Sequence, residues 1–142
     1  MTVFGDSSFL VALFYKDDKY HKTAVEIGKE LEEKEAVLII SNICLAEAVN
    51  VVFRVSGPKQ AKKFYNLIMK SKIKLFSINQ EIYQKGLRVL FKQKSKQGVN
   101  FFDCLHLAAM KYLKIKTILS FDRDFEKAGV RVMGRGGVGV GA

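Results

Sequence analysis

Five carboxylates stand in apolar stretches of the sequence, where a charged side chain needs an explanation. They are Asp6 after TVFG, Glu47 within ICLAEAVNVV, Asp103 within FFDCLHLAAM, and Asp122 and Asp124 within SFDRDF. Burying an unpaired charge costs free energy, and carboxylates that share a pocket raise each other's pKa unless a cation neutralises them. Because hard oxygen ligands suit Mg²⁺ or Mn²⁺, the pattern favours a divalent-metal site.

Each carboxylate also has an explanation that needs no metal. Asp6 could form a turn at a strand end, and Asp103 could simply favour the first turn of a helix. Asp122 or Asp124 could cap a short turn, and Glu47 could pair with a lysine. All of these explanations would have to hold together, although few cationic residues lie near the acids in the sequence. Both interpretations stay open at this point.

Three further residues near Asp103 have types that could do chemistry. His106 lies three positions later, so the two side chains share one side of a helix. His106 could assist proton transfer or bind a metal, but we expect a packed, hydrogen-bonded histidine. Phe101 and Phe102 could stack on nucleic-acid bases, but apolar residues at a helix start are more often core.

Hydrophobic patterning predicts the elements that must position these residues. AVLIIS is a continuous apolar run of strand length, as expected for a strand buried on both faces. Asn100 has N-cap chemistry for the helix that carries Asp103, and Gly57-Pro58 separates two other helices. Strands are expected at 2–5, 36–41, 73–78, 116–121 and 130–133. Helices are expected at 7–15, 20–34, 42–55, 58–70, 81–94 and 101–113.

This alternation of strands and helices predicts the α/β class, as a single domain over residues 1–133. We expect a central parallel sheet of four to five strands with helices on both faces. Residues just beyond the carboxyl ends of parallel strands gather at one edge, where ligands bind. Asp6 and Asp122 occupy such positions, and Asp103 can lean toward the same edge. The end, GRGGVGVGA (134–142), is expected to be a disordered tail or a non-native extension.

Composition excludes several classes of protein. The 142 residues are 49% hydrophobic and 27% charged, as in an ordinary globular domain. No apolar run approaches the roughly 20 residues of a membrane helix, and the N-terminus lacks a basic signal region. We therefore expect a cytoplasmic protein without membrane contact. Cys44 and Cys104 lie in apolar patterns without C-x-x-C spacing, and we expect buried free thiols.

The net charge of +10 is concentrated in the middle of the chain. Residues 48–102 contain twelve Lys or Arg and one acid, Glu81. Such a block is either a solvated face or a surface that attracts nucleic acid. An acidic pocket in a basic protein suits phosphodiester chemistry, because lysines hold the backbone while a metal acts on one phosphate. The candidate RNA contacts are Lys62, Lys63, Lys70, Lys72 and Arg123.

Four stretches of the chain resemble the acidic signatures of the PIN-domain family, in the family's order and spacing. They are D-S-S-F-L at 6–10, the lone acid of ICLAEAVNVV, N-F-F-D-C-L-H-L-A-A at 100–109, and I-L-S-F-D-R-D-F at 118–125. The resemblance covers residues 2–133 and is closest to small single-domain VapC-type toxins. It implies that the metal-binding and catalytic acids are Asp6, Glu47, Asp103 and Asp122. It also implies that Asp124 is a more variable extra acid, with Ser7 and Ser120 as hydroxyl residues beside the acids.

What the resemblance implies is a Mg²⁺- or Mn²⁺-dependent endoribonuclease that hydrolyses RNA phosphodiesters. It further implies a toxin of a toxin–antitoxin pair, with RNA as substrate, a small antitoxin protein as partner, and a homodimer. One alternative is a non-catalytic PIN-fold module that binds RNA or protein. A metal-dependent phosphatase is a weaker alternative, because its common motif D-x-D is here D-S-S.

Overall fold

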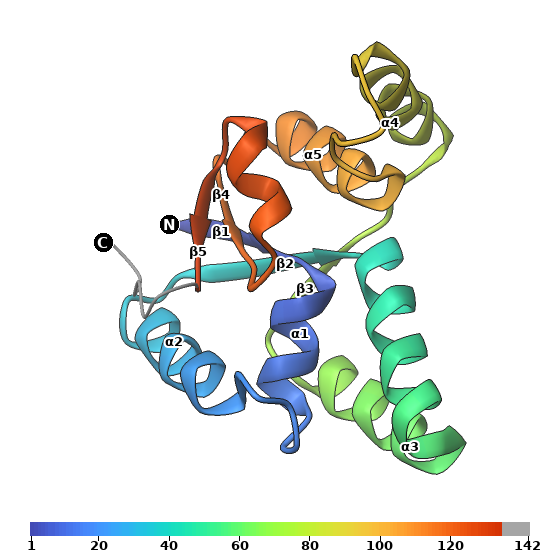
Figure 1. Cartoon of the computed structure of the whole chain (residues 1–142). Coiled ribbons are helices and arrows are strands. Elements are labelled where there is room, and N and C mark those ends of the chain that lie inside the picture. Colours follow the sequence, from blue (N-terminus) through green and yellow to red (C-terminus); the bar gives the residue numbers. More distant parts are fainter. Residues whose placement is uncertain (135–142) are drawn as a thin grey trace.

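The computed structural model describes residues 1–134, without the side chains of Arg123 and Lys127. The predicted tail lies outside these residues except for Gly134. One sheet has five parallel strands in the order β3-β2-β1-β4-β5, which confirms the predicted α/β class (Figure 1). Its strands are β1 (Thr2–Gly5), β2 (Val37–Ser41), β3 (Lys74–Phe76), β4 (Thr117–Leu119) and β5 (Arg131–Met133).

Helices cover both faces of the sheet, as predicted. Their bounds are α1 (Ser7–Phe14), α2 (His21–Glu33), α3 (Asn42–Lys70), α4 (Gln80–Lys92), α5 (Phe101–Leu113) and the 3₁₀ helix η1 (Arg123–Ala128). The side chains of β1 show the two layers. Val3 packs with residues of α1 and α2, whereas Phe4 packs with residues of α4 and α5. Figure 1 shows α1, α2 and α3 on one side of the sheet and α5 and α4 on the other.

Polar caps begin the helices that follow the carboxyl ends of the strands. Asp6 accepts from Phe9 N (2.9 Å), and Ser41 accepts from Cys44 N (2.9 Å), so α1 and α3 start directly after β1 and β2. Asn100 caps α5 as predicted, through Asp103 N (2.9 Å). Each cap satisfies an amide that has no partner within its helix. The helix starts that carry the acids are thereby fixed at one edge of the sheet.

Helix α3 contains the predicted break. Gly57 has φ of 85°, a left-handed value that glycine adopts without strain, and Pro58 begins the second half. The second half ends at Lys70, and β3 starts at Lys74 in parallel with β2. The chain therefore returns to the amino ends of the strands after this helix.

Two local expectations about burial have different outcomes. Phe102 is 48% exposed, so the prediction that it is a core residue is wrong: within the first turn of α5 it is Asp103 and Cys104 that face inward. Phe101 is half-buried against Tyr83, with ring centroids 5.3 Å apart. Both cysteines are buried free thiols, as predicted.

Among the described residues, none of the helices has the length and apolar character needed to cross a membrane.

Candidate metal centre

Asp6 is held by hydrogen bonds on both carboxylate oxygens. Oδ1 accepts from Ser8 Oγ (2.8 Å) and from Phe9 N (2.9 Å), while Oδ2 accepts from Ser120 Oγ (2.5 Å). The side chain is 3% exposed. Burial raises the pKa of Asp6, and the hydrogen bonds oppose that rise. The carboxylate is therefore fixed in orientation before any ligand arrives.

Strand pairing explains why Ser120 reaches Asp6. Gly5 and Leu119 are register partners in the parallel pair β1–β4, so the next residues of both strands lie side by side. Ser120 Oγ also accepts from Asp122 N (2.9 Å). One hydroxyl thus links the two strand ends that carry acids.

Ser8, which the sequence reading missed, is the serine of the D-S-S stretch that bonds to Asp6. Its Oγ donates to Asp6 and accepts from Phe121 N (3.0 Å). Ser7 lies beside it and lines a neighbouring cavity. Recognising Asp6 as the N-cap of α1 would have identified Ser8 from the sequence. The residue two positions after an N-cap aspartate can donate to its carboxylate, as Ser8 does here.

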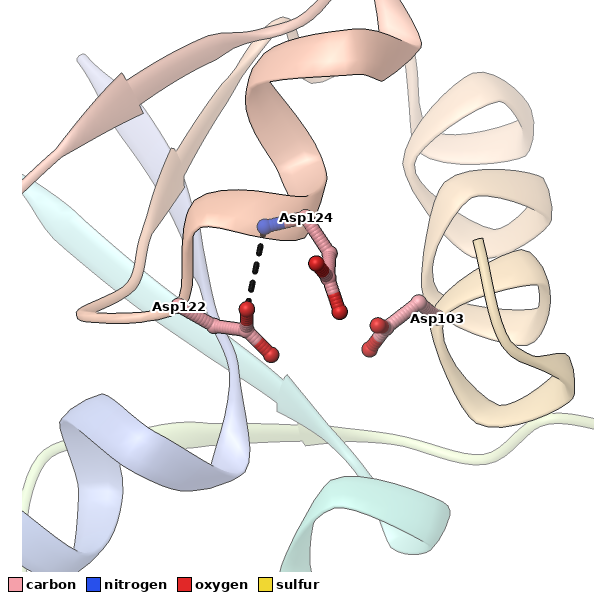
Figure 2. Close-up of side chains that lie close together, drawn as sticks. All are labelled: Asp103, Asp122 and Asp124. Carbon is pink, nitrogen blue, oxygen red and sulfur yellow. Dashed lines mark hydrogen bonds between the residues drawn. The ribbon is translucent and has the colours of Figure 1, made fainter. Parts of the chain in front are cut away.

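Three carboxylates from α5 and the start of η1 point toward one another in Figure 2. Asp103, Asp122 and Asp124 each offer an oxygen within 4.8 Å of the others. Asp122 Oδ1 accepts from Asp124 N (3.0 Å), so Asp122 does cap the short turn, as the metal-free alternative held. The cap uses only Oδ1 of Asp122, so its other oxygen stays available beside Asp103 and Asp124.

Asp103 is the least satisfied member of this group. It is 7% exposed, and its Oδ2 is buried without a hydrogen-bond partner among the described residues. Burial raises the pKa of Asp103 to about 7, and the charges of Asp122, Asp6 and Glu47 add to the rise against an opposing effect of His106. Three other predicted acids therefore act electrostatically on Asp103.

Glu47 pairs with a histidine. The alternative that it pairs with a lysine is wrong for the part of the chain that the structure describes. Glu47 Oε1 lies 3.0 Å from His106 Nε2. His106 is 1% exposed, and its Nδ1 is 3.5 Å from Ser41 Oγ, as expected for a packed, hydrogen-bonded histidine. No pattern in the sequence indicates this pair, since its members are 59 positions apart.

The donors at this edge fit a divalent cation. All are carboxylate oxygens, the preferred ligands of Mg²⁺ and Mn²⁺. A buried oxygen without a partner, surrounded by other negative charges, is costly unless a cation compensates it. Among the described residues, Asp103, Asp122 and Asp124 are close enough together to share one ion, whereas this group does not include the predicted ligands Asp6 and Glu47. Asp6 and Glu47 act on Asp103 through their charges.

The predicted RNA-contacting lysines are not all near these acids. Lys62, Lys63 and Lys70 line a cavity of about 350 Å³ on the second half of α3. Lys70 and Lys72 also line a larger cavity of about 710 Å³ at the amino ends of β2 and β3. Because the acids lie at the carboxyl ends, Lys70 and Lys72 lie at the opposite edge of the sheet. The side chain of Arg123 lies outside the described part of the chain.

Comparisons with known proteins agree with this architecture. Residues 3–130 match the model of the PIN domain family, whereas no curated protein matches the sequence significantly. VapC20 of Mycobacterium tuberculosis, described as a sarcin–ricin loop cleaving toxin, has 24% identity and a TM-score of 0.76 over 90% of this chain and 95% of that one. A chain of VapBC2 from Rickettsia felis, bound to a promoter DNA fragment, has 18% identity and a TM-score of 0.70, covering 94% and 98%. A chain of VapBC-1 from nontypeable Haemophilus influenzae has 16% identity and a TM-score of 0.65, covering 94% and 97%.

Proposed function

We propose, from the premise that the chain belongs to the PIN domain family, that it is a divalent-metal-dependent endoribonuclease. The observation that carries this proposal is the buried Asp103 Oδ2, which lacks a partner among the described residues and faces other carboxylates. A site of this kind is suited to a cation rather than to a neutral ligand. Mg²⁺ or Mn²⁺ matches the all-oxygen donor set.

The residues at the site have separate tasks in this proposal. Asp6, Glu47, Asp103 and Asp122 would hold the ion, and Asp124 would supply a further carboxylate. Two observations support this set: Asp103 and Asp122 lie together with Asp124, and the charges of Asp6 and Glu47 reach Asp103. When bound, the ion supplies an activated water and offsets the charge that develops on the scissile phosphate. Ser8 and Ser120 keep Asp6 in place, and His106 does the same for Glu47.

We also propose that the protein is the toxin of a toxin–antitoxin pair, acting in the cytoplasm as a homodimer with a small antitoxin protein as its partner. The similarity to VapC20 and to chains of VapBC structures supports this assignment. Exposed apolar side chains on α3 offer surface for such contacts: Phe53 is 49% exposed and Val55 is 69% exposed.

Turnover with purified protein tests the proposed reaction. We expect cleavage of a structured RNA with Mg²⁺ or Mn²⁺, and loss of cleavage when EDTA is added. Asp103→Asn should remove cleavage while RNA binding remains measurable. RNA binding without cleavage by the wild-type protein would instead identify a non-catalytic binding module, and equal cleavage in EDTA would contradict the metal mechanism.

A further inference from the structure

A cavity of about 540 Å³ is lined by Asp122, one of the acids of the proposed metal centre, and by two aromatic side chains. Its lining includes Ser8, Val11, Lys19, Tyr20, Phe121 and Asp122. Asp122 belongs to the proposed metal centre, and Phe121 is its neighbour in the chain. Any group that enters this cavity therefore sits next to the site where a phosphate would react. The size is that of a small-ligand pocket.

The two aromatic side chains form a parallel stack of Tyr20 on Phe121. The ring centroids are 4.5 Å apart and the ring planes differ by 2°. Phe121 also makes a T-shaped contact with the buried Phe9 (centroids 6.1 Å apart, 88° between the planes), and its amide donates to Ser8 Oγ. The stack is thus built on the same residues that hold Asp6.

The turn that carries Tyr20 is tied down by hydrogen bonds. Asp18 Oδ2 accepts from Tyr20 N (3.0 Å), and Asp18 O accepts from His21 N (3.0 Å). His21 Nδ1 lies 2.7 Å from Ala12 O of α1. A ring held in this way loses little freedom when a ligand binds, which is the advantage of a preorganised site.

The outer face of Tyr20 is covered by a lysine side chain and is not packed into the core. Tyr20 is 39% exposed, and since Phe121 covers one face, the Lys19 ammonium at 4.9 Å from the centroid lies over the other. A face that attracts a cation also offers a surface on which a base can stack. The flexible lysine can leave the ring and meet a phosphate of the same strand.

We propose that this cavity is a subsite for one nucleobase of the RNA substrate, with Tyr20 as the stacking platform and Lys19 as a contact to the adjacent phosphate. The proposal rests on the proposed ribonuclease function and adds the residues that position the strand. Structural packing alone would explain the Tyr20–Phe121 stack, but it does not require a cavity that joins the stack to Asp122.

Binding of short RNAs tests the subsite without turnover. The probes are fluorescein-labelled RNA 12-mers of C, A or U and a matched abasic 12-mer, titrated in EDTA against protein carrying Asp103→Asn. Adding Tyr20→Ala or Tyr20→Leu should weaken the best-bound base-containing probe about tenfold, because a stacked base contributes on that scale. The leucine variant keeps apolar packing on Phe121 but has no π-face. Tyr20→Phe should bind within about twofold of the parent.

Two controls make the result decisive. The abasic probe should bind equally to all variants, and Tyr112→Ala should not change binding, because Tyr112 is an exposed tyrosine in the last turn of α5, far from Asp103. Unchanged affinity of the Tyr20→Leu protein for every probe would overturn the subsite and leave the ribonuclease proposal standing. Absence of binding to all probes by the parent protein would contradict both.

Discussion

At the scale of single residues, the ionisation of Asp103 makes the stability of the metal-free protein depend on pH. Its folded pKa of about 7 lies well above the ordinary value of 3.8, chiefly because the side chain is buried and then because Asp122, Asp6 and Glu47 are negative. The folded state therefore holds a proton that the unfolded state releases. Between those two pKa values the unfolded chain binds fewer protons, so raising the pH lowers the stability of the metal-free protein.

This proton linkage predicts a pH-dependent effect of Asp103→Asn. The asparagine cannot ionise, so the variant escapes the loss of stability that the wild type suffers between pH 4 and about pH 7. In EDTA, the difference in melting temperature in favour of the variant should be larger at pH 8 than at pH 5. A constant difference across that range would mean that Asp103 titrates near its ordinary pKa in the folded protein.

The pairing of His106 with Glu47 gives a second prediction at this scale. His106→Leu removes the hydrogen-bond partner of Glu47 Oε1, whereas His106→Gln retains a donor in the same buried place. Partners of metal-binding carboxylates commonly affect metal affinity by about 10- to 100-fold. Calorimetric titration with Mn²⁺ should show weaker binding for the leucine variant and partial recovery for the glutamine variant. Equal affinities in all three proteins would limit His106 to packing.

At the scale of elements, the helix caps connect local sequence to the geometry of the site. The span 101–113 was predictable because Asn100 and the apolar pattern agree. The pairing of Glu47 with His106 was not predictable, because it depends on where α3 lies against α5, and hydrophobic periodicity does not encode that arrangement. The choice of Ser8 over Ser7 and the exposure of Phe102 likewise depend on the exact direction of a first helical turn.

Removing the cap of α5 should affect the site as well as stability. Asn100 accepts from the amide of Asp103 itself, so Asn100→Ala should lower the free energy of unfolding by about 1 kcal/mol and weaken Mn²⁺ binding. Asn79→Ala is a matched control, because Asn79 caps α4 in the same way and α4 carries none of the acids of the proposed metal centre. Urea denaturation should show similar losses for both variants. Equal Mn²⁺ affinity in the two variants would show that the Asn100 cap does not position Asp103 for metal binding.

At the scale of the whole molecule, part of the basic block lies at the edge of the sheet opposite the acids. The α/β class and the parallel order were predictable from the alternation of elements, and so was the gathering of acids at the carboxyl ends. The position of the basic block was not, because its location depends on the return of the chain after Gly57. Lys70 and Lys72 consequently lie at the edge opposite the acids.

This separation predicts unequal roles for the lysines in RNA binding. Neutralising Lys62 and Lys63 together should reduce the salt dependence of RNA affinity, since each lost phosphate contact removes about 0.7 from the slope for single-stranded RNA. Neutralising Lys70 and Lys72, at the edge opposite the acids, should reduce this salt dependence less. The slope of log Kd against log salt concentration measures both. If neither pair of substitutions changes this slope, the basic block is only a solvated face and does not contact RNA.

Thermal melting of wild type and Asp103→Asn, each in EDTA and in Mn²⁺, tests the central claim most directly because it needs no substrate. A cation that binds only the folded state should raise the wild-type melting temperature, and at ten times its Kd the gain is about 1.4 kcal/mol. At pH 8, above the raised pKa of Asp103, Asp103→Asn should melt higher than wild type in EDTA, because it removes a charge from a group of like charges. It should also lose most of the Mn²⁺-dependent rise. A variant that melts lower than wild type in EDTA and keeps the full rise in Mn²⁺ would contradict the metal centre.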